Sequence, residues 1–418
     1  MNFRTLLAPV LLLALSSQVA LAFELFPEFE NLSEQEQTRF EKPEAIGAEY
    51  QSDFLTYMLP KDWQYSWLSH PRAAEFSAGS VSPVHFLISN RVKIHHELSK
   101  YLEVRFTYYA DRTRERDSTH ALLEMVAWPS KKIGVGIYAE PSLYKRDNDV
   151  GVALLYRPQG TANHEIRLFQ TWVDLTRNKR SDMTDRFNKD KLPYARGLVG
   201  RWWRPLAMGP KDYIEYAIRQ ETLTSWEFPD QNYVYDYSGA LVSLTVSREL
   251  KSERRLDLRA QVDRKFENKT GTVSESWRTD RALIDSNLKF SGLGPGRTYT
   301  FTPGLMFAVR QWHSRQAELM QRHLLPHFWI HAPAFRTFGG DPDAVGLGYE
   351  LTWYLQSGAG SLDPLHSNGG ATEHRINLSY DLKINPEATF RLLATFDGDS
   401  LGTGDTWEGG AAQLHFVF

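Results

Sequence analysis

Apolar and polar residues alternate with a period of two along much of the chain, which is the pattern of β-strands with one apolar and one polar face. At residues 406–418 one face would hold Gly410, Ala412, Leu414, Phe416 and Phe418, and the other Ala411, Gln413 and His415. The same pattern recurs at residues 84–98, 102–108, 133–139, 150–156, 256–262, 299–309, 345–353, 376–382 and 390–396. So many strands with one apolar face predict one large shared surface.

The segments between these stretches predict how the strands are joined. Longer loops are expected at residues 111–119, 145–148, 177–193, 226–232, 266–276, 311–323, 356–371 and 398–405. Short turns are expected at residues 99–100, 129–131, 157–163, 206–211, 251–253, 292–297, 338–344 and 385–388. Because loops and turns alternate, the order is up-and-down and antiparallel. One further strand at Trp63 to Phe76 makes the number even, so about 18 strands are predicted, with 16 as the fallback.

The stretch Thr406 to Phe418 resembles the closing strand of a Gram-negative outer-membrane β-barrel, whose insertion signal is an alternating apolar strand that ends in Phe. The resemblance is to this porin-like class, covers most of the mature chain and identifies no specific family. It implies an all-β fold, a transmembrane antiparallel up-and-down β-barrel, with Leu414, Phe416 and Phe418 as the insertion signal. It also implies localisation in the cell outer membrane, with outer-membrane lipid, lipopolysaccharide and the barrel-assembly machinery as partners.

The beginning of the chain predicts export. Residues 1–22 have a basic start, an apolar run and a small-residue end at Ala20-Leu21-Ala22, so a signal peptide cleaved after Ala22 is expected. Residues 23–62 are expected to form a periplasmic or lumenal leader, and residues 63–418 the transmembrane barrel. No segment after residue 22 has 18 consecutive apolar residues, which excludes helical membrane spans in the mature chain.

Composition narrows the function. The formal net charge of −3 gives no support for nucleic-acid binding, which needs a basic surface. The chain has no cysteine, so its stability must come from burial and hydrogen bonding. Only 42% of the residues are hydrophobic, which fits a barrel in which half of each strand faces water. We expect no cofactor and no metal site; a monomer and a homo-oligomer both stay open.

Charged residues at the polar positions are the candidate site. An Arg or Lys on the lipid face would cost about 2–4 kcal/mol at the bilayer midplane, so these side chains are expected to line the lumen. The predicted pore-lining residues are Lys93, Glu97, Glu103, Arg105, Glu124, Glu140, Glu165, Arg167, Arg201, Glu215, Arg219, Arg255, Asp257, Arg259, Arg281, Arg310, Glu350, Arg375, Asp381 and Arg391. Either they form a polar pore, or they cross-link the interior by ion pairs that serve stability alone. Aromatic residues near strand ends, Trp128 among them, are expected in girdles at the membrane interfaces.

The function that follows is an outer-membrane pore for passive diffusion of small hydrophilic solutes, and not an enzyme. One alternative is an export barrel for a polysaccharide that works with periplasmic partners. A second is a lipid hydrolase, because Leu365-His366-Ser367-Asn368-Gly369 resembles the His-x-Ser-Asn-Gly motif of outer-membrane phospholipase A. In that family His and Ser are two apart on one strand face, whereas His366 and Ser367 are adjacent and would point to opposite faces, which argues against the hydrolase.

Overall fold

The computed structural model divides the chain into two compact units, residues 1–54 and 55–418. The described residues all belong to the second unit: 71–82, 85–113, 117–140, 149–172, 186–187, 194–203, 212–228, 233–251, 253–271, 275–314, 317–338, 340–360, 369–402 and 406–418. The predicted signal peptide, the leader and the His366-Ser367 motif lie outside them and stay predictions. No helix among the described residues is both long enough and apolar enough to cross a membrane.

The described residues form one sheet. Its strands are β1 (Arg72–Ser82), β2 (His85–Ser99), β3 (Leu102–Thr113), β4 (Asp117–Ala127), β5 (Ile133–Glu140), β6 (Asp149–Tyr156), β7 (His164–Trp172), β8 (Arg186–Phe187), β9 (Tyr194–Trp203), β10 (Tyr213–Phe228), β11 (Tyr233–Lys251), β12 (Arg254–Gly271), β13 (Glu275–Leu293), β14 (Tyr299–Ser314), β15 (Ala317–Pro333), β16 (Ala344–Gly360), β17 (Gly369–Asn385), β18 (Ala388–Asp397) and β19 (Trp407–Val417). A 3-10 turn, η4 (Pro295–Arg297), precedes β14.

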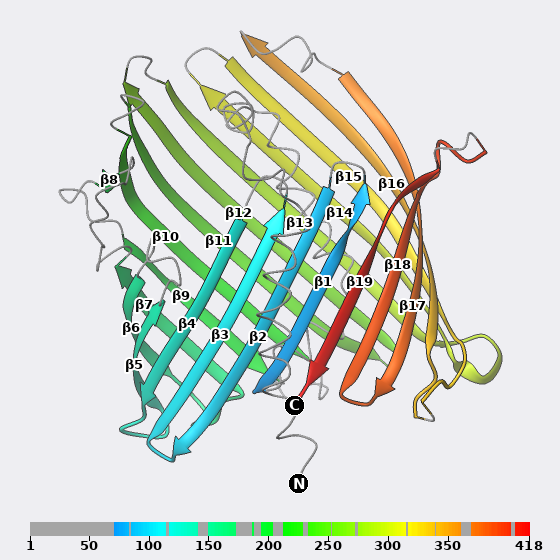
Figure 1. Ribbon diagram of the computed structural model, residues 1–418, viewed down its shortest axis with the longest axis horizontal. Coiled ribbons are helices and arrows are strands. Elements are labelled where there is room, and N and C mark those ends of the chain that lie inside the picture. The colour runs from blue at the N-terminus through cyan, green and yellow to red at the C-terminus, as the bar shows by residue number, and fades with distance from the viewer. Residues whose placement is uncertain are drawn as a thin grey trace, which may run out of the picture. The chain divides into compact units, whose positions relative to one another are not determined.

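Each strand pairs antiparallel with the next, except that β7 pairs directly with β9 and the two-residue β8 pairs with the far part of β10. Because β1 also pairs with β19, the sheet closes on itself (Figure 1). The fold is therefore a closed antiparallel barrel of 18 strands, which confirms the predicted fold class and strand number. A closed barrel gives the backbone groups of every strand a partner on both sides.

The seam between β1 and β19 is held on both faces. Glu75 is directly opposite His415 in the register, and His415 Nδ1 lies 3.1 Å from Glu75 Oε1, with both side chains buried. On the other face, the rings of Phe76 and Phe416 stack with their centroids 6.1 Å apart. The predicted two-faced pattern of residues 406–418 is thus present, and its polar face is the buried one.

Burial in this barrel is inverted relative to a water-soluble protein. On β4, Leu123 and Met125 are 45% and 52% exposed, whereas the alternating Glu124 and Val126 are 2% and 0% exposed. On β5, Ile137 is 63% exposed. Large apolar side chains therefore cover the outside of the barrel, and charged and amide side chains are enclosed on its inner face.

The loop pattern expected from the sequence is wrong in part. Residues 311–323 do not form a long loop, because β14 continues to Ser314 and β15 begins at Ala317. At the other end, β15 and β16 are joined by residues 334–343, which is longer than the predicted turn. Of the strand predicted at Trp63 to Phe76, the described part begins at Arg72 as β1, and residues 63–70 lie outside the described residues.

The strands are longer than the sequence pattern indicates. A transmembrane strand needs about 9–11 residues, yet β11 and β13 have 19 each. Beyond the lipid both faces of a strand meet water, so the hydrogen-bonded ladder continues without the apolar alternation that marks a strand in sequence. Figure 1 shows these strands (green) extending well past β5 to β7.

Candidate functional site: the charged inner wall

Arg105 on β3 and Glu165 on β7 lie four strands apart, and their side chains are in direct contact. Arg105 Nη1 donates to Glu165 Oε1 at 2.7 Å, and Nη2 donates to Oε2 at 2.9 Å. Strands in a flat sheet are spaced by about 4.8 Å, so these residues would be about 19 Å apart without curvature. The sheet therefore curls tightly between β3 and β7, which brings the inner faces of these two strands together.

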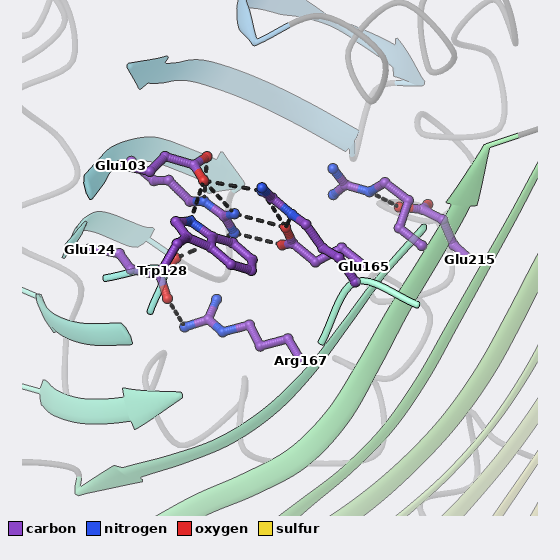
Figure 2. Close-up of polar contacts among 9 residues, drawn as sticks. Glu103, Glu124, Trp128, Glu165, Arg167 and Glu215 are labelled. Atoms are coloured by element: carbon purple, nitrogen blue, oxygen red, sulfur yellow. Dashed lines mark hydrogen bonds and ion pairs between the residues drawn. The ribbon is translucent and has the colours of Figure 1, made fainter. Parts of the chain in front are cut away.

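Three arginines and three glutamates meet in this corner (Figure 2). We call them the corner cluster: Glu103, Arg105, Glu124, Arg157, Glu165 and Arg167. Arg105 also binds Glu103 through Nε at 2.9 Å, and Arg157 bridges Glu165 Oε2 and Glu103 Oε2 at 2.8 Å and 3.1 Å. Arg167 Nη2 lies 3.0 Å from Glu124 Oε1. The cluster is neutral in sum, and its bidentate, shared contacts are the geometry that offsets the cost of burying charge.

An apolar core lies against the corner cluster inside the barrel. It consists of Val126, Trp128, Tyr138, Ala153, Leu155 and Phe169. The indole N–H of Trp128 donates to Glu103 Oε2 at 3.2 Å, and the guanidinium of Arg157 lies 3.7 Å from the Trp128 ring centroid. Tyr138 packs over Gly151, where a side chain would overlap the ring. The corner is therefore a filled part of the barrel, and its charged groups are already engaged with one another.

Elsewhere on the inner wall, opposite charges face each other across neighbouring strands. Arg201 and Glu215 are directly paired in the register of β9 and β10, at 3.2 Å. The same holds for Arg281 and Asp263 at 2.7 Å and for Arg391 and Asp381 at 2.5 Å. Arg201 and Glu215 keep 37% and 26% of their side chains exposed, so this pair is accessible from the lumen in a way that the corner cluster is not.

A row of polar side chains continues the wall across β16, β17 and β18. Asn377 Nδ2 donates to Glu350 Oε1 at 2.8 Å, and Thr395 Oγ1 donates to Asn377 Oδ1 at 2.9 Å. All three residues have 0% exposed surface. Their neighbour Arg375 binds Glu408 at 2.7 Å.

The predicted pore-lining residues fall into four groups. Buried are Lys93, Glu103, Arg105, Glu124, Asp257, Arg310, Glu350, Asp381 and Arg391. Partly buried are Glu165, Arg167, Arg201, Glu215, Arg255, Arg259, Arg281 and Arg375, while Glu97 and Arg219 are exposed. The side chain of Glu140 lies outside the described residues. That any of them contacts a solute remains a prediction.

Two residues of the corner lie in places other than those predicted from the sequence. Arg157 was expected in a turn, yet its side chain binds Glu103 and Glu165. Trp128 was expected in an interface girdle, but it is 6% exposed and packs inside the barrel. Arg157 continues the alternation of the buried Ala153 and Leu155 one step past the end of β6, so extending the strand parity by two residues would have found it.

The side chains on the outer surface indicate the environment of the barrel. Its exposed side chains include Ile137 and Leu154 on β5 and β6, Val242 and Val262 on β11 and β12, and Leu392 on β18. A closed sheet with apolar side chains outside and charges inside can cross a lipid bilayer, because no backbone group is left without a partner. The chain is an outer-membrane β-barrel protein.

No protein-family model matches this outer-membrane barrel, and no curated protein matches it either. Among solved structures it is similar to a bacterial polysaccharide outer membrane secretin, with 8% identity, a TM-score of 0.40, and 84% of this chain and 99% of that chain covered. It is also similar to OccD3 (OpdP) of Pseudomonas aeruginosa, with 13% identity, a TM-score of 0.35, and 84% and 91% covered. OmpT of Vibrio cholerae, in its trimer form, gives 8% identity, a TM-score of 0.37, and 83% and 98% covered. At such low identities and TM-scores, no property of these proteins is transferred to this chain.

Within the described ranges, no group of three or more His, Asp or Glu residues could hold a metal ion. What the inner wall offers chemically is a set of paired charges and amides. These groups can solvate polar solutes and ions.

Proposed function

We propose that this barrel is an outer-membrane pore for passive diffusion of small hydrophilic solutes. The observation that carries the proposal is the polar inner face of a closed 18-strand barrel. Barrels of 16–18 strands leave an aqueous channel unless loops or other segments fill them. The corner cluster and its apolar core fill the inner face at β3 to β7, so we expect solutes to pass along the remaining strands.

The pairing of charges bears on which solutes pass. Several cations on this wall have an anion opposite them, as with Arg201 and Glu215 or Arg281 and Asp263. Paired charges give a weak net field along the bore, so we expect little discrimination between cations and anions. Small neutral solutes such as sugars should also pass.

Single-channel recording in planar bilayers tests the proposal. Purified full-length barrel should give stepwise conductance in potassium chloride, with a cation-to-anion permeability ratio close to one. Liposomes carrying the barrel should swell in isotonic solutions of small sugars. Absence of conductance under all conditions would overturn the proposal. Conductance that appears only when a periplasmic partner is added would instead support the export of a polysaccharide.

A further inference from the structure

The outer face of β12 to β15 changes from apolar to polar between two neighbouring rows of the sheet. In the last apolar row, Val262, Ala282 and Val309 follow one another across the register, and Val309 is paired with Arg322. The next row consists of Arg264, Asp280, Gln311 and Met320. Val262 is 58% exposed, which marks the edge of the lipid-covered belt.

Arg322 sits in the apolar row, but its guanidinium reaches the polar one. Its Nη2 lies 2.8 Å from the sulfur of Met320, and its other neighbour in the row is Leu355, which is 56% exposed. No carboxylate lies within ion-pair distance of Arg322 among the described residues. An arginine at the edge of a lipid belt extends its head toward the headgroup layer in this way.

Two further arginines lie in the polar row or beside it. Arg264 and Arg278 share one carboxylate, Asp280: Arg264 Nε is bonded to Oδ1, and Arg278 Nε lies 2.9 Å from Oδ2. Their side chains are 53% and 39% exposed. Another acid on this face, Glu318, accepts a hydrogen bond from Gln311 at 2.8 Å and lies 3.5 Å from His313. Arg264, Arg278 and Arg322 together therefore carry two more positive charges than Asp280 balances.

These residues lie at the end of the barrel opposite to the one where β1 begins and β19 ends. The longest segment between successive barrel strands, residues 173–193, joins β7 to β9 at the same end. In outer-membrane barrels the longer connections are extracellular, so this edge of the belt meets the outer leaflet.

We propose that Arg264, Arg278 and Arg322, which we call the rim patch, bind the phosphate groups of lipopolysaccharide in the outer leaflet. Guanidinium groups bind phosphate oxygens in bidentate geometry. The patch spans β12 to β15, about 14 Å across the sheet, so it can engage more than one phosphate group. Asp280 holds two of the arginines in place without neutralising the patch. The proposal is independent of whether the bore is open.

The test is lipid binding by the purified full-length barrel in detergent, counted by native mass spectrometry during a titration with lipid A. Arg322→Gln and Arg264→Gln each remove a charge and keep hydrogen-bonding capacity. Each should weaken lipid A binding at least tenfold, because a hydrogen bond to a charged group is worth about 1.5–3 kcal/mol. Arg322→Lys should retain most of the binding. Heat-modifiable migration in gels shows that each variant is folded.

Arg248→Gln is the matched control, since Arg248 is an exposed arginine on the outer face of β11 near the opposite end of the barrel. It should leave lipid A binding unchanged, and dephosphorylated lipid A should bind the native barrel weakly. Equal loss in Arg248→Gln, equal binding of dephosphorylated lipid A, or preference for phosphatidylglycerol over lipid A would each overturn the proposal. Unchanged binding in both Arg322→Gln and Arg264→Gln would do so as well.

Discussion

Asp343 binds the neighbouring strand at Lys383: its Oδ1 accepts the backbone N–H of Lys383 at 2.8 Å. Asp343 precedes β16, and its neighbour Ala344 is paired with Asp381, two residues before Lys383. Asp212 precedes β10 and has the same relationship with β11, since its Oδ1 accepts the N–H of Glu249 at 2.7 Å. The barrel thus uses a buried aspartate at this end to extend the pairing of two strands by one hydrogen bond.

Asp343 makes the stability of this connection depend on pH. The hydroxyl of Thr337, bonded to Oδ2 at 2.5 Å, holds the pKa of the Asp343 carboxyl below its usual value, and Tyr380 and the Lys383 N–H act in the same direction. A lowered pKa in the folded state stabilises the fold above the ordinary carboxyl pKa of about 3.9, and this stabilisation is lost as the pH falls through the folded value.

Asp343→Asn should therefore lower the stability of the barrel at pH 7 and reduce the loss of stability on acidification below pH 4. Urea unfolding in lipid vesicles at pH 7 and pH 3 measures both effects. Asp341→Asn is the control, because Asp341 is an exposed residue in the same connection. If the two variants give the same pH profile, the bonds to the Asp343 carboxylate do not stabilise the fold.

The corner cluster predicts strong coupling between Arg105 and Glu165. Arg105→Gln leaves Glu165 and Glu103 without their main cation, which should cost about 3–5 kcal/mol for a buried pair that loses one partner. Combining it with Glu165→Gln should cost less than the sum of the two single variants, with a coupling of about 0.5–3 kcal/mol. Unfolding free energies of the four proteins give the cycle.

An exposed pair on the outer face provides the comparison. Arg264 and Asp280 are 53% and 23% exposed, and their coupling should be about 0–1 kcal/mol. A coupling at Arg105 and Glu165 no larger than this would mean that the cluster does not hold β3 and β7 together.

The corner cluster shows which features of the site can be predicted from the sequence. The alternation of Glu103 and Arg105 with apolar neighbours placed both on the inner face, since parity along one strand is a local property. That Arg105 meets Glu165 was not predictable, because it depends on how sharply the sheet curls over β4, β5 and β6. The strand ends within residues 311–323 were misplaced because polar side chains such as Gln311 and Glu318 occupy the outer face there. Without apolar residues at the outer positions, the alternation that identifies a strand is absent.

Charge pairing on the inner wall predicts the effect of removing one partner. Asp263→Asn removes the carboxylate that binds Arg281 at 2.7 Å, so the lumen side gains one net positive charge. If the barrel conducts, its permeability should shift toward anions, measured as the reversal potential in a potassium chloride gradient. Asp280→Asn is the matched control, because Asp280 lies on the outer face of the strand that carries Arg281. A shift of equal size in the control would place the effect at the mouth and not in the bore.

A side chain at position 151 would clash with the ring of Tyr138. The two are directly paired in the register of β5 and β6, and a Cβ on Gly151 would lie 2.1 Å from Tyr138 Cζ. Gly151→Ala must displace the ring and break the 2.6 Å hydrogen bond between Tyr138 and Thr171, so it should destabilise the barrel by about 1–3 kcal/mol. Adding Tyr138→Ala should make the alanine at 151 nearly neutral, because the clash is gone.

Gly340→Ala is the control: with nothing within 4 Å of its added Cβ, it should be neutral or slightly stabilising. Urea unfolding that ranks Gly151→Ala with Gly340→Ala would show that Tyr138 has room to move, and that the corner is packed less tightly than its contacts indicate.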